Sequence, residues 1–204
     1  MDRSFTPLAD PAWRYVDKPS LDSFAAEDWA VMLPQRQRYF AGRQAREALA
    51  MLEATREDPS FGYMVNNYRH SLLSATRALR AGEDEEFVVV CLLHDIGFTI
   101  ADASHGEFAA ALLRPFVSER NHWMLAHHQI FQAWHCPTYP GIERDGRERF
   151  RGHPHFAWTA RFVALFDQNT IDPGEECLPI EAFAPMVHRL FDRPPQPRRF
   201  EGAA

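Results

Sequence analysis

The dipeptide His94-Asp95 constrains this chain more than any other feature, because it ends an apolar run over residues 87–93. An imidazole and a carboxylate that are buried side by side cost free energy unless another charge compensates them. A metal ion would compensate both groups. The pair therefore indicates a buried functional site at the end of this run.

Further histidines and one aspartate continue the same chemistry along the chain. The candidate ligands are His70, His94, Asp95, His105, Asp167 and one of the neighbours His127 and His128. Imidazole and carboxylate ligands together suit iron, manganese or zinc. Because adjacent helical residues point about 100° apart, we expect only one of His127 and His128 to be a ligand. The order of these residues predicts a metal enzyme.

The same geometry bears on His94 and Asp95, which are adjacent as well. Either the end of their helix faces one ion, or the two residues serve different ions. In the second case Asp95 would bridge two metals. His70, His94, Asp95 and Asp167 would then complete one ion, with His105 and His128 on the other. Open positions would remain for water, substrate or dioxygen.

Helical spacing of apolar residues predicts an all-α bundle with long loops. The valines at 88–90 have high strand propensity, but their run continues through His94-Asp95 to Gly97, which favours a helix. We expect a break at Pro34 and a long loop over 137–154. The expected helices cover 25–33, 35–56, 64–81, 83–95, 105–113, 119–131, 155–167 and 181–191.

Length and composition bound the class of protein. The 204 residues suit one main domain at 58–192, preceded by an arm and helices (1–57) packed on the core and followed by a Pro-rich tail (193–204). A net charge of −6 argues against a general nucleic-acid binder. No apolar stretch approaches the ~20 residues of a membrane span. Three cysteines without a CxxC pair, and an N-terminus without a secretory signal, predict a cytoplasmic protein.

At these residues the chain resembles the HD-domain superfamily, which is named for the pair seen here as His94-Asp95. More narrowly, it is similar to the mixed-valent diiron oxygenase branch, which includes myo-inositol oxygenase and aminohydroxyethylphosphonate oxygenase; related chains are often called predicted HD phosphohydrolases. The resemblance covers roughly residues 58–192. The segments that carry it are 61–72, 92–97, 105–115 and Phe166-Asp167.

The resemblance implies an HD-domain helical bundle with an N-terminal helical extension and two iron ions, Fe(II) and Fe(III), with manganese or zinc as the alternative. The implied reaction uses O2 to cleave a C–C or C–P bond of a small hydroxylated substrate. His94 and Asp95 would belong to the catalytic machinery. An aromatic stretch ending at Trp134-His135 follows His128 at nearly the family's spacing, which favours His128 over His127 as the fourth histidine ligand.

Two other readings stay open at this point. A metal-dependent phosphohydrolase would attack a phosphate ester with a metal-bound water. It would need basic residues near the metals, and the candidates are Arg69, Arg114 and Arg161. A non-catalytic, ligand-sensing HD module is the third reading, although the complete set of ligands argues against it.

Several positions depart from the oxygenase pattern. The family's gating Tyr and Glu fall at Ser60 and Tyr63, so Tyr63 is the remaining candidate for a gate or catalytic contact at the mouth. A histidine is replaced by Phe98, a substrate-binding lysine by Gln132, and an arginine falls near Ala164. The loss of cationic groups predicts a less charged substrate. The expected substrate contacts are Phe98, His127, Phe131, Gln132 and Trp134. The oligomeric state does not follow from the sequence.

Overall fold

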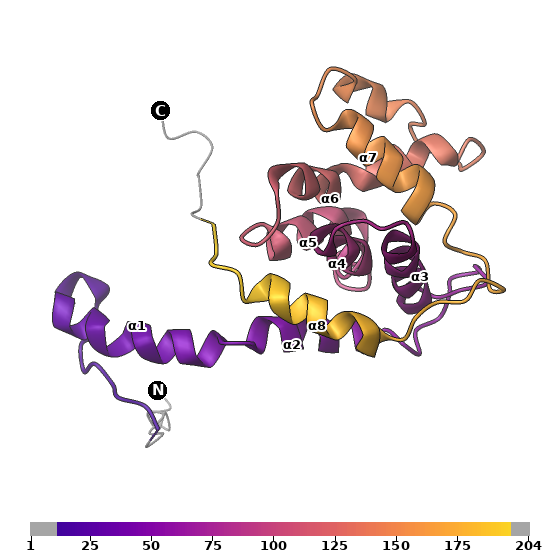
Figure 1. Cartoon of the computed structure of the whole chain (residues 1–204). Helices are drawn as coiled ribbons and strands as arrows, with labels where there is room; N and C mark the ends of the chain where they lie inside the picture. Colours follow the sequence, from indigo (N-terminus) through magenta and orange to yellow (C-terminus); the bar gives the residue numbers. More distant parts are fainter. Residues whose placement is uncertain (1–11, 197–204) are drawn as a thin grey trace, which may run out of the picture. The chain divides into compact units, whose positions relative to one another are not determined.

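A computed structural model describes residues 12–196, and every regular element in that range is a helix (Figure 1). The all-α prediction is confirmed for this part of the chain. The Pro-rich tail lies mostly outside the described residues, as does the first half of the arm. The helices are α1 (Ala26–Phe40), α2 (Arg43–Glu53), α3 (Asn67–Arg80), α4 (Glu85–Leu93), α5 (His105–Leu113), α6 (Glu119–Gln132), α7 (Phe156–Phe162) and α8 (Ile180–Phe191).

The chain divides into two compact units between residues 44 and 45, and the domain limits predicted from the sequence stay a prediction. In the first unit α1 runs through Pro34, so the predicted helix break at this proline is wrong. The backbone breaks instead at Gly42, where φ is +63°. Glycine adopts this left-handed conformation without steric cost. A proline removes only one helical hydrogen bond, and α1 tolerates that loss.

Helix α4 is the centre of the second unit. Its residues 87–93 are fully buried, and it contacts α3, α6 and α8. A helix that is apolar on every face is stable only when it is covered on every side. The side chain of Asp84 accepts a hydrogen bond from the backbone N–H of Phe87 at 2.8 Å and caps the helix start. The helical interpretation of the three valines is therefore confirmed.

The other helices of this unit begin and end close to their predicted limits. Helix α5 matches the prediction at both ends, and α3 begins three residues late because Asn66 caps it by accepting from the N–H of Arg69 at 3.0 Å. The predicted helix 155–167 is α7 followed by a π-helical turn, Val163–Asp167. Such turns insert one extra residue and are frequent at functional sites. Here the turn ends on a candidate ligand. The predicted loop 137–154 contains a short 3₁₀ helix, Gly146–Phe150.

Among residues 12–196, no helix combines the length and the apolar character that crossing a membrane requires.

Candidate metal centre

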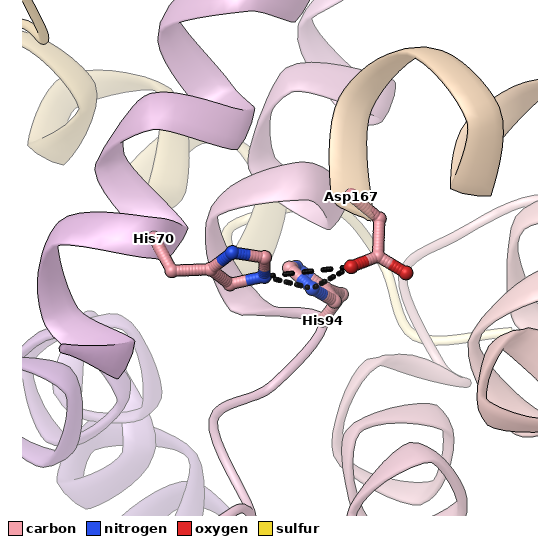
Figure 2. Close-up of side chains that lie close together, drawn as sticks. All are labelled: His70, His94 and Asp167. Carbon is pink, nitrogen blue, oxygen red and sulfur yellow. Dashed lines mark hydrogen bonds and ion pairs between the residues drawn. The ribbon is translucent and has the colours of Figure 1, made fainter. Parts of the chain in front are cut away.

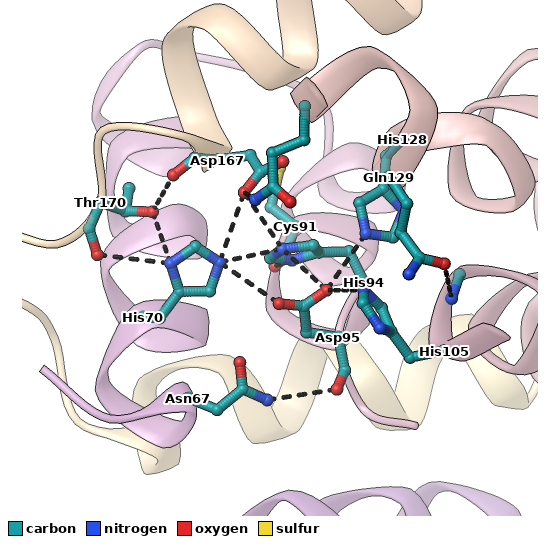
Figure 3. Close-up of polar contacts among 12 residues, drawn as sticks. Asn67, His70, Cys91, His94, Asp95, His105, His128, Gln129, Asp167 and Thr170 are labelled. Atoms are coloured by element: carbon teal, nitrogen blue, oxygen red, sulfur yellow. Dashed lines mark hydrogen bonds and ion pairs between the residues drawn. The ribbon is translucent and has the colours of Figure 1, made fainter. Parts of the chain in front are cut away.

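Four histidines and two aspartates from separate parts of the second unit converge in its core (Figure 3). Helix α3 supplies His70, and the end of α4 supplies His94 and Asp95. The first residue of α5 is His105, helix α6 supplies His128, and the π-helical turn ends at Asp167. All six are at most 8% exposed. These are the ligands that the sequence predicts, and the structure brings them together.

One group consists of His70, His94 and Asp167, whose ligand atoms all lie within 4.8 Å of one another (Figure 2). The Nε2 atoms of His70 and His94 are 3.0 Å apart. The Oδ1 atom of Asp167 lies 3.5 Å from His70 Nε2 and 3.8 Å from His94 Nε2. Two imidazoles and a carboxylate at these separations can hold one metal ion.

The second group surrounds Asp95. Its Oδ1 atom lies 3.1 Å from Nε2 of both His105 and His128, and 3.4 Å from Nε2 of His94. Its other oxygen, Oδ2, lies 3.5 Å from Nε2 of His70 in the first group. His94, Asp95 and His128 also satisfy the 4.8 Å criterion. The two oxygens of Asp95 thus face different histidines, as a carboxylate shared between two ions would.

The histidine tautomers follow from the hydrogen bonds of the opposite ring nitrogen. The Nδ1 atoms of His94, His105 and His128 each lie 2.8 Å from the backbone carbonyl three residues earlier. A carbonyl only accepts, so each Nδ1 carries a proton and, in the neutral ring, each Nε2 presents a lone pair. The partner of an imidazole's outer nitrogen fixes ring orientation in metal sites.

His70 reaches the same state through Thr170. The hydroxyl of Thr170 donates to the backbone carbonyl of Asp167, so its oxygen accepts from Nδ1 of His70 at 2.8 Å (Figure 3). The Nε2 atom of His70 therefore also presents a lone pair. The sequence reading did not assign Thr170 to the site. Its only signal is its position three residues after Asp167, within reach of that residue's carbonyl.

The centre is therefore built from acceptors that face acceptors. Nε2 lone pairs point at one another and at carboxylate oxygens, and Oδ2 of Asp167 is buried with no hydrogen-bond partner among the described residues. Such an arrangement is unfavourable unless a cation lies between the groups. The residues present fit a metal ion. A mixed nitrogen and oxygen set suits iron, manganese or zinc and does not decide among them.

Burial also sets the charges of the centre. It lowers the pKa of His94 to about 3, so this imidazole is neutral near neutral pH. Burial raises the pKa of Asp167 to about 6. Burial acts on Asp95 in the same direction, but the neighbouring His94, His105 and His128 outweigh it and hold the pKa of Asp95 well below its usual range. The histidine most buried in the centre therefore does not supply the positive charge that the carboxylates need.

The predicted substrate contacts fall in different places. Phe98 lies beside the ligands, with its ring centroid 5.4 Å from that of His105. The amide of Gln132 donates to Oδ1 of Asp167 at 3.2 Å, so this residue orients a ligand. Tyr63 is 60% exposed, and its role as a gate stays a prediction.

Three other predicted contacts belong to an aromatic region on α6 and the segment after it. Phe131 is fully buried against Phe156, and its role as a substrate contact stays a prediction. The indole of Trp134 lies under the guanidinium of Arg147, 3.9 Å from ring centroid to cation. His127 stacks on Trp123. Of the two neighbouring histidines, the structure brings His128 to the ligand set.

The three basic residues that hydrolysis would need are placed as follows. Arg69 donates to the backbone carbonyls of Pro173 and Glu175, and Arg161 forms an ion pair with Glu83. Arg114 follows the last residue of α5. The backbone of Arg114 therefore lies roughly 13 Å along the helix axis from that of His105.

No protein-family model matches this chain, and a search of curated proteins finds no relative. The resemblance to the HD-domain superfamily therefore remains a prediction that rests on the residues quoted above.

Proposed function

We propose that this chain is a dinuclear metal enzyme of the HD-domain superfamily, a non-haem diiron oxygenase that uses O2 to cleave a C–C or C–P bond of a small hydroxylated substrate. The observation that carries the proposal is the position of Asp95. One of its oxygens faces His94, His105 and His128, while the other faces His70. A single carboxylate between two histidine groups suits a pair of ions better than one ion.

The ligands can be divided between two ions, although His94 lies within reach of both groups. His70, His94 and Asp167 would hold the first, together with one oxygen of Asp95. His105 and His128 would hold the second, with the other oxygen of Asp95. Each ion would then have two histidines and at least one carboxylate, the set that non-haem iron oxygenases use with positions left open. When bound, an iron pair would supply the redox chemistry with O2.

The protein's own residues would orient these ligands and exclude water. Gln132 and Thr170 fix Asp167 and His70 by hydrogen bonds. The side chains of His94 and Asp167 are fully buried, which keeps bulk water from that side of the centre. A substrate hydroxyl would take an open position on the less buried side.

The surroundings favour an oxygenase over a phosphohydrolase. Hydrolysis of a phosphate ester needs positive charge around the transferred group. The guanidinium groups of Arg69 and Arg161 bind backbone carbonyls and a glutamate instead. Lys18, the only lysine of the chain, forms an ion pair with Asp28.

Metal analysis of protein purified without added metal tests the proposal, together with electron paramagnetic resonance after partial anaerobic reduction. We expect about two iron ions per chain and the signal of a spin-coupled Fe(II)/Fe(III) pair. Oxygen consumption with small hydroxylated substrates would follow. Manganese or zinc in place of iron, with turnover of phosphate esters, would overturn the oxygenase assignment in favour of hydrolysis.

A further inference from the structure

The metal centre is not buried equally on all sides. The side chains of His70 and Asp95 are each 11% exposed and that of His105 is 8% exposed. The side chains of His94 and Asp167 are 0% exposed, and that of His128 is 1% exposed. A substrate therefore reaches the ligands from the side where α3 and α5 begin and where α4 has just ended.

A row of aromatic rings leads from a ligand to the surface on this side. The ring of Phe98 lies 5.4 Å from that of His105, and the ring of Phe61 lies 5.8 Å from that of Phe98. Phe98 is half-buried, whereas Phe61 is 65% exposed. A molecule that contacts the centre beside His105 would therefore meet aromatic carbon before it meets solvent.

The backbone of Phe61 is unusual as well. Its φ of +54° is the only positive value of a non-glycine residue in the described part of the chain. A bulky residue in this conformation costs free energy, and such costs cluster at ligand-binding segments. Gly62 follows with φ of +102°. The turn therefore holds a large exposed ring next to Phe98 at a position where glycine would be less strained.

The segments beside Phe61 and Phe98 expose apolar side chains, and the two nearby arginines already have partners. Tyr63, Met64 and Ile100 are each at least 60% exposed, which is unusual for large apolar side chains. Residues 61–64 lead into α3, and Ile100 follows the turn after Asp95. Arg56 pairs with Glu53, and Arg69 donates to two backbone carbonyls. An anionic body would find little positive charge here.

We infer that the centre takes a substrate with a metal-binding oxygen group and an uncharged, apolar body, which lies against Phe98 and is covered by Phe61. The inference rests on the proposed metal centre, but it does not depend on which metal the centre holds. It assigns the ring of Phe61 as a contact of the apolar body, and Phe98 as a residue that determines specificity.

Two hydroxamates with the same metal-binding group test the inference. Acetohydroxamate carries a methyl group and benzohydroxamate a phenyl ring, and both bind iron and zinc. Titration calorimetry with the metal-loaded full chain gives the ratio of their affinities. We expect benzohydroxamate to bind at least about tenfold more tightly, because its ring buries additional apolar surface.

Variants locate the source of this preference. Phe98→Ala should reduce the affinity ratio towards one while leaving acetohydroxamate binding nearly unchanged, and Phe98→Leu should restore part of the ratio. Phe61→Gly removes the ring without straining the turn and should lower the ratio as well. Tyr139→Ala, which truncates another exposed aromatic residue (64% exposed), is the matched control and should leave the ratio unchanged.

The outcomes separate the two proposals. If neither hydroxamate binds to protein that has been given metal, the proposed metal centre itself fails. If both bind with equal affinity, the metal centre stands and the apolar substrate class is overturned. A preference that survives Phe98→Ala and Phe61→Gly would overturn the assignment of these two rings.

Discussion

The second unit contains two histidine-rich regions that differ in what their rings face. In the metal centre, Nδ1 atoms bind backbone or hydroxyl oxygens and Nε2 atoms converge on carboxylates. In the other region His127 and His153, which are distant in sequence, both stack on the indole of Trp123, at centroid distances of 4.0 and 4.1 Å. The described residues that could share an ion all belong to the first region.

The comparison shows that histidine number does not define a metal site. His127 donates to the carbonyl of Trp123 just as His128 donates to that of Leu125. The difference lies in the second ring nitrogen, which faces Asp95 only in His128. Burial and the neighbouring His155 and His127 lower the pKa of His153, which favours an uncharged stack. The candidate metal centre therefore differs from the aromatic region in having carboxylate oxygens that face the Nε2 atoms of its histidines.

Removing the central carboxylate should have the largest effect. Asp95→Ala should bind fewer than about one metal ion per chain, because both ligand groups lose an oxygen. Circular dichroism should show that the variant keeps most of its helical content. Asp102→Ala is the matched control, since its side chain is exposed while its backbone carbonyl still binds His105. Normal metal content in Asp95→Ala would contradict a shared carboxylate.

Truncating the neighbouring histidines one at a time tests the boundary between the two regions. His128→Ala should lose about one ion per chain, whereas His127→Ala should keep its metal and lose about 1 kcal/mol of stability with the aromatic stack. Metal analysis and thermal unfolding of both variants give the comparison. Equal metal loss in the two would mean that the regions are not distinct.

Removing the hydroxyl that orients His70 should have a smaller effect on metal binding. Thr170→Val removes the nearer acceptor for Nδ1 of His70, the hydroxyl at 2.8 Å, and leaves the backbone carbonyl of Thr170 at 3.3 Å, so metal binding should weaken about 10-fold. Competition with a chelator measures this change. Thr159→Val is the control, because Thr159 is also fully buried and also donates to a backbone carbonyl, that of His155. A matching loss of affinity in the control would point to general loosening.

The smallest effect concerns the start of α6, the helix that carries both His127 and His128. Burial alone would raise the pKa of Glu86, but hydrogen bonds from the backbone N–H of Ser118, from Arg193 and from Asn121 hold it below its ordinary value. A depressed carboxyl pKa stabilises the fold above the unfolded-state pKa of about 4.3, and this stabilisation is lost as the pH falls through the folded-state value.

Glu86→Gln in metal-free protein should therefore cost roughly 1 kcal/mol at neutral pH. The difference from the unchanged chain should shrink in acid, where Glu86 becomes protonated. Urea unfolding at several pH values measures it, with the exposed Glu107→Gln as control. A difference that is independent of pH would show that the charge of Glu86 is not what anchors α6.

Sequence alone was sufficient for the helical class and for the six side chains that converge in the core; their role as metal ligands stays a prediction. The reason is physical: His94 and Asp95 end a run that has to be buried, and buried polar groups need partners. Helix α5 was placed correctly because Ser104 and Pro115 flank it. The break at Gly42 was missed, since tolerance of Pro34 inside α1 depends on the surrounding fold.

The roles of individual side chains around the ligands were harder to predict. Phe98 and Phe131 look alike in sequence, yet one lies beside His105 and the other is fully buried against Phe156. Which way a ring points depends on the packing of elements that are distant in sequence. Thr170 escaped notice for the same reason, because its partner His70 lies on another element.

The hydrogen bond between His70 and Thr170 joins residues one hundred positions apart. During synthesis the early ligands leave the ribosome long before Asp167 and Thr170 do, so the nascent chain holds a partial set of acceptors. Metal affinity for such a partial set is low, since binding and folding are coupled. In the proposed metal centre, metal capture would therefore mark completion of the second unit, because the set of ligands is complete only once the chain has folded as far as Thr170.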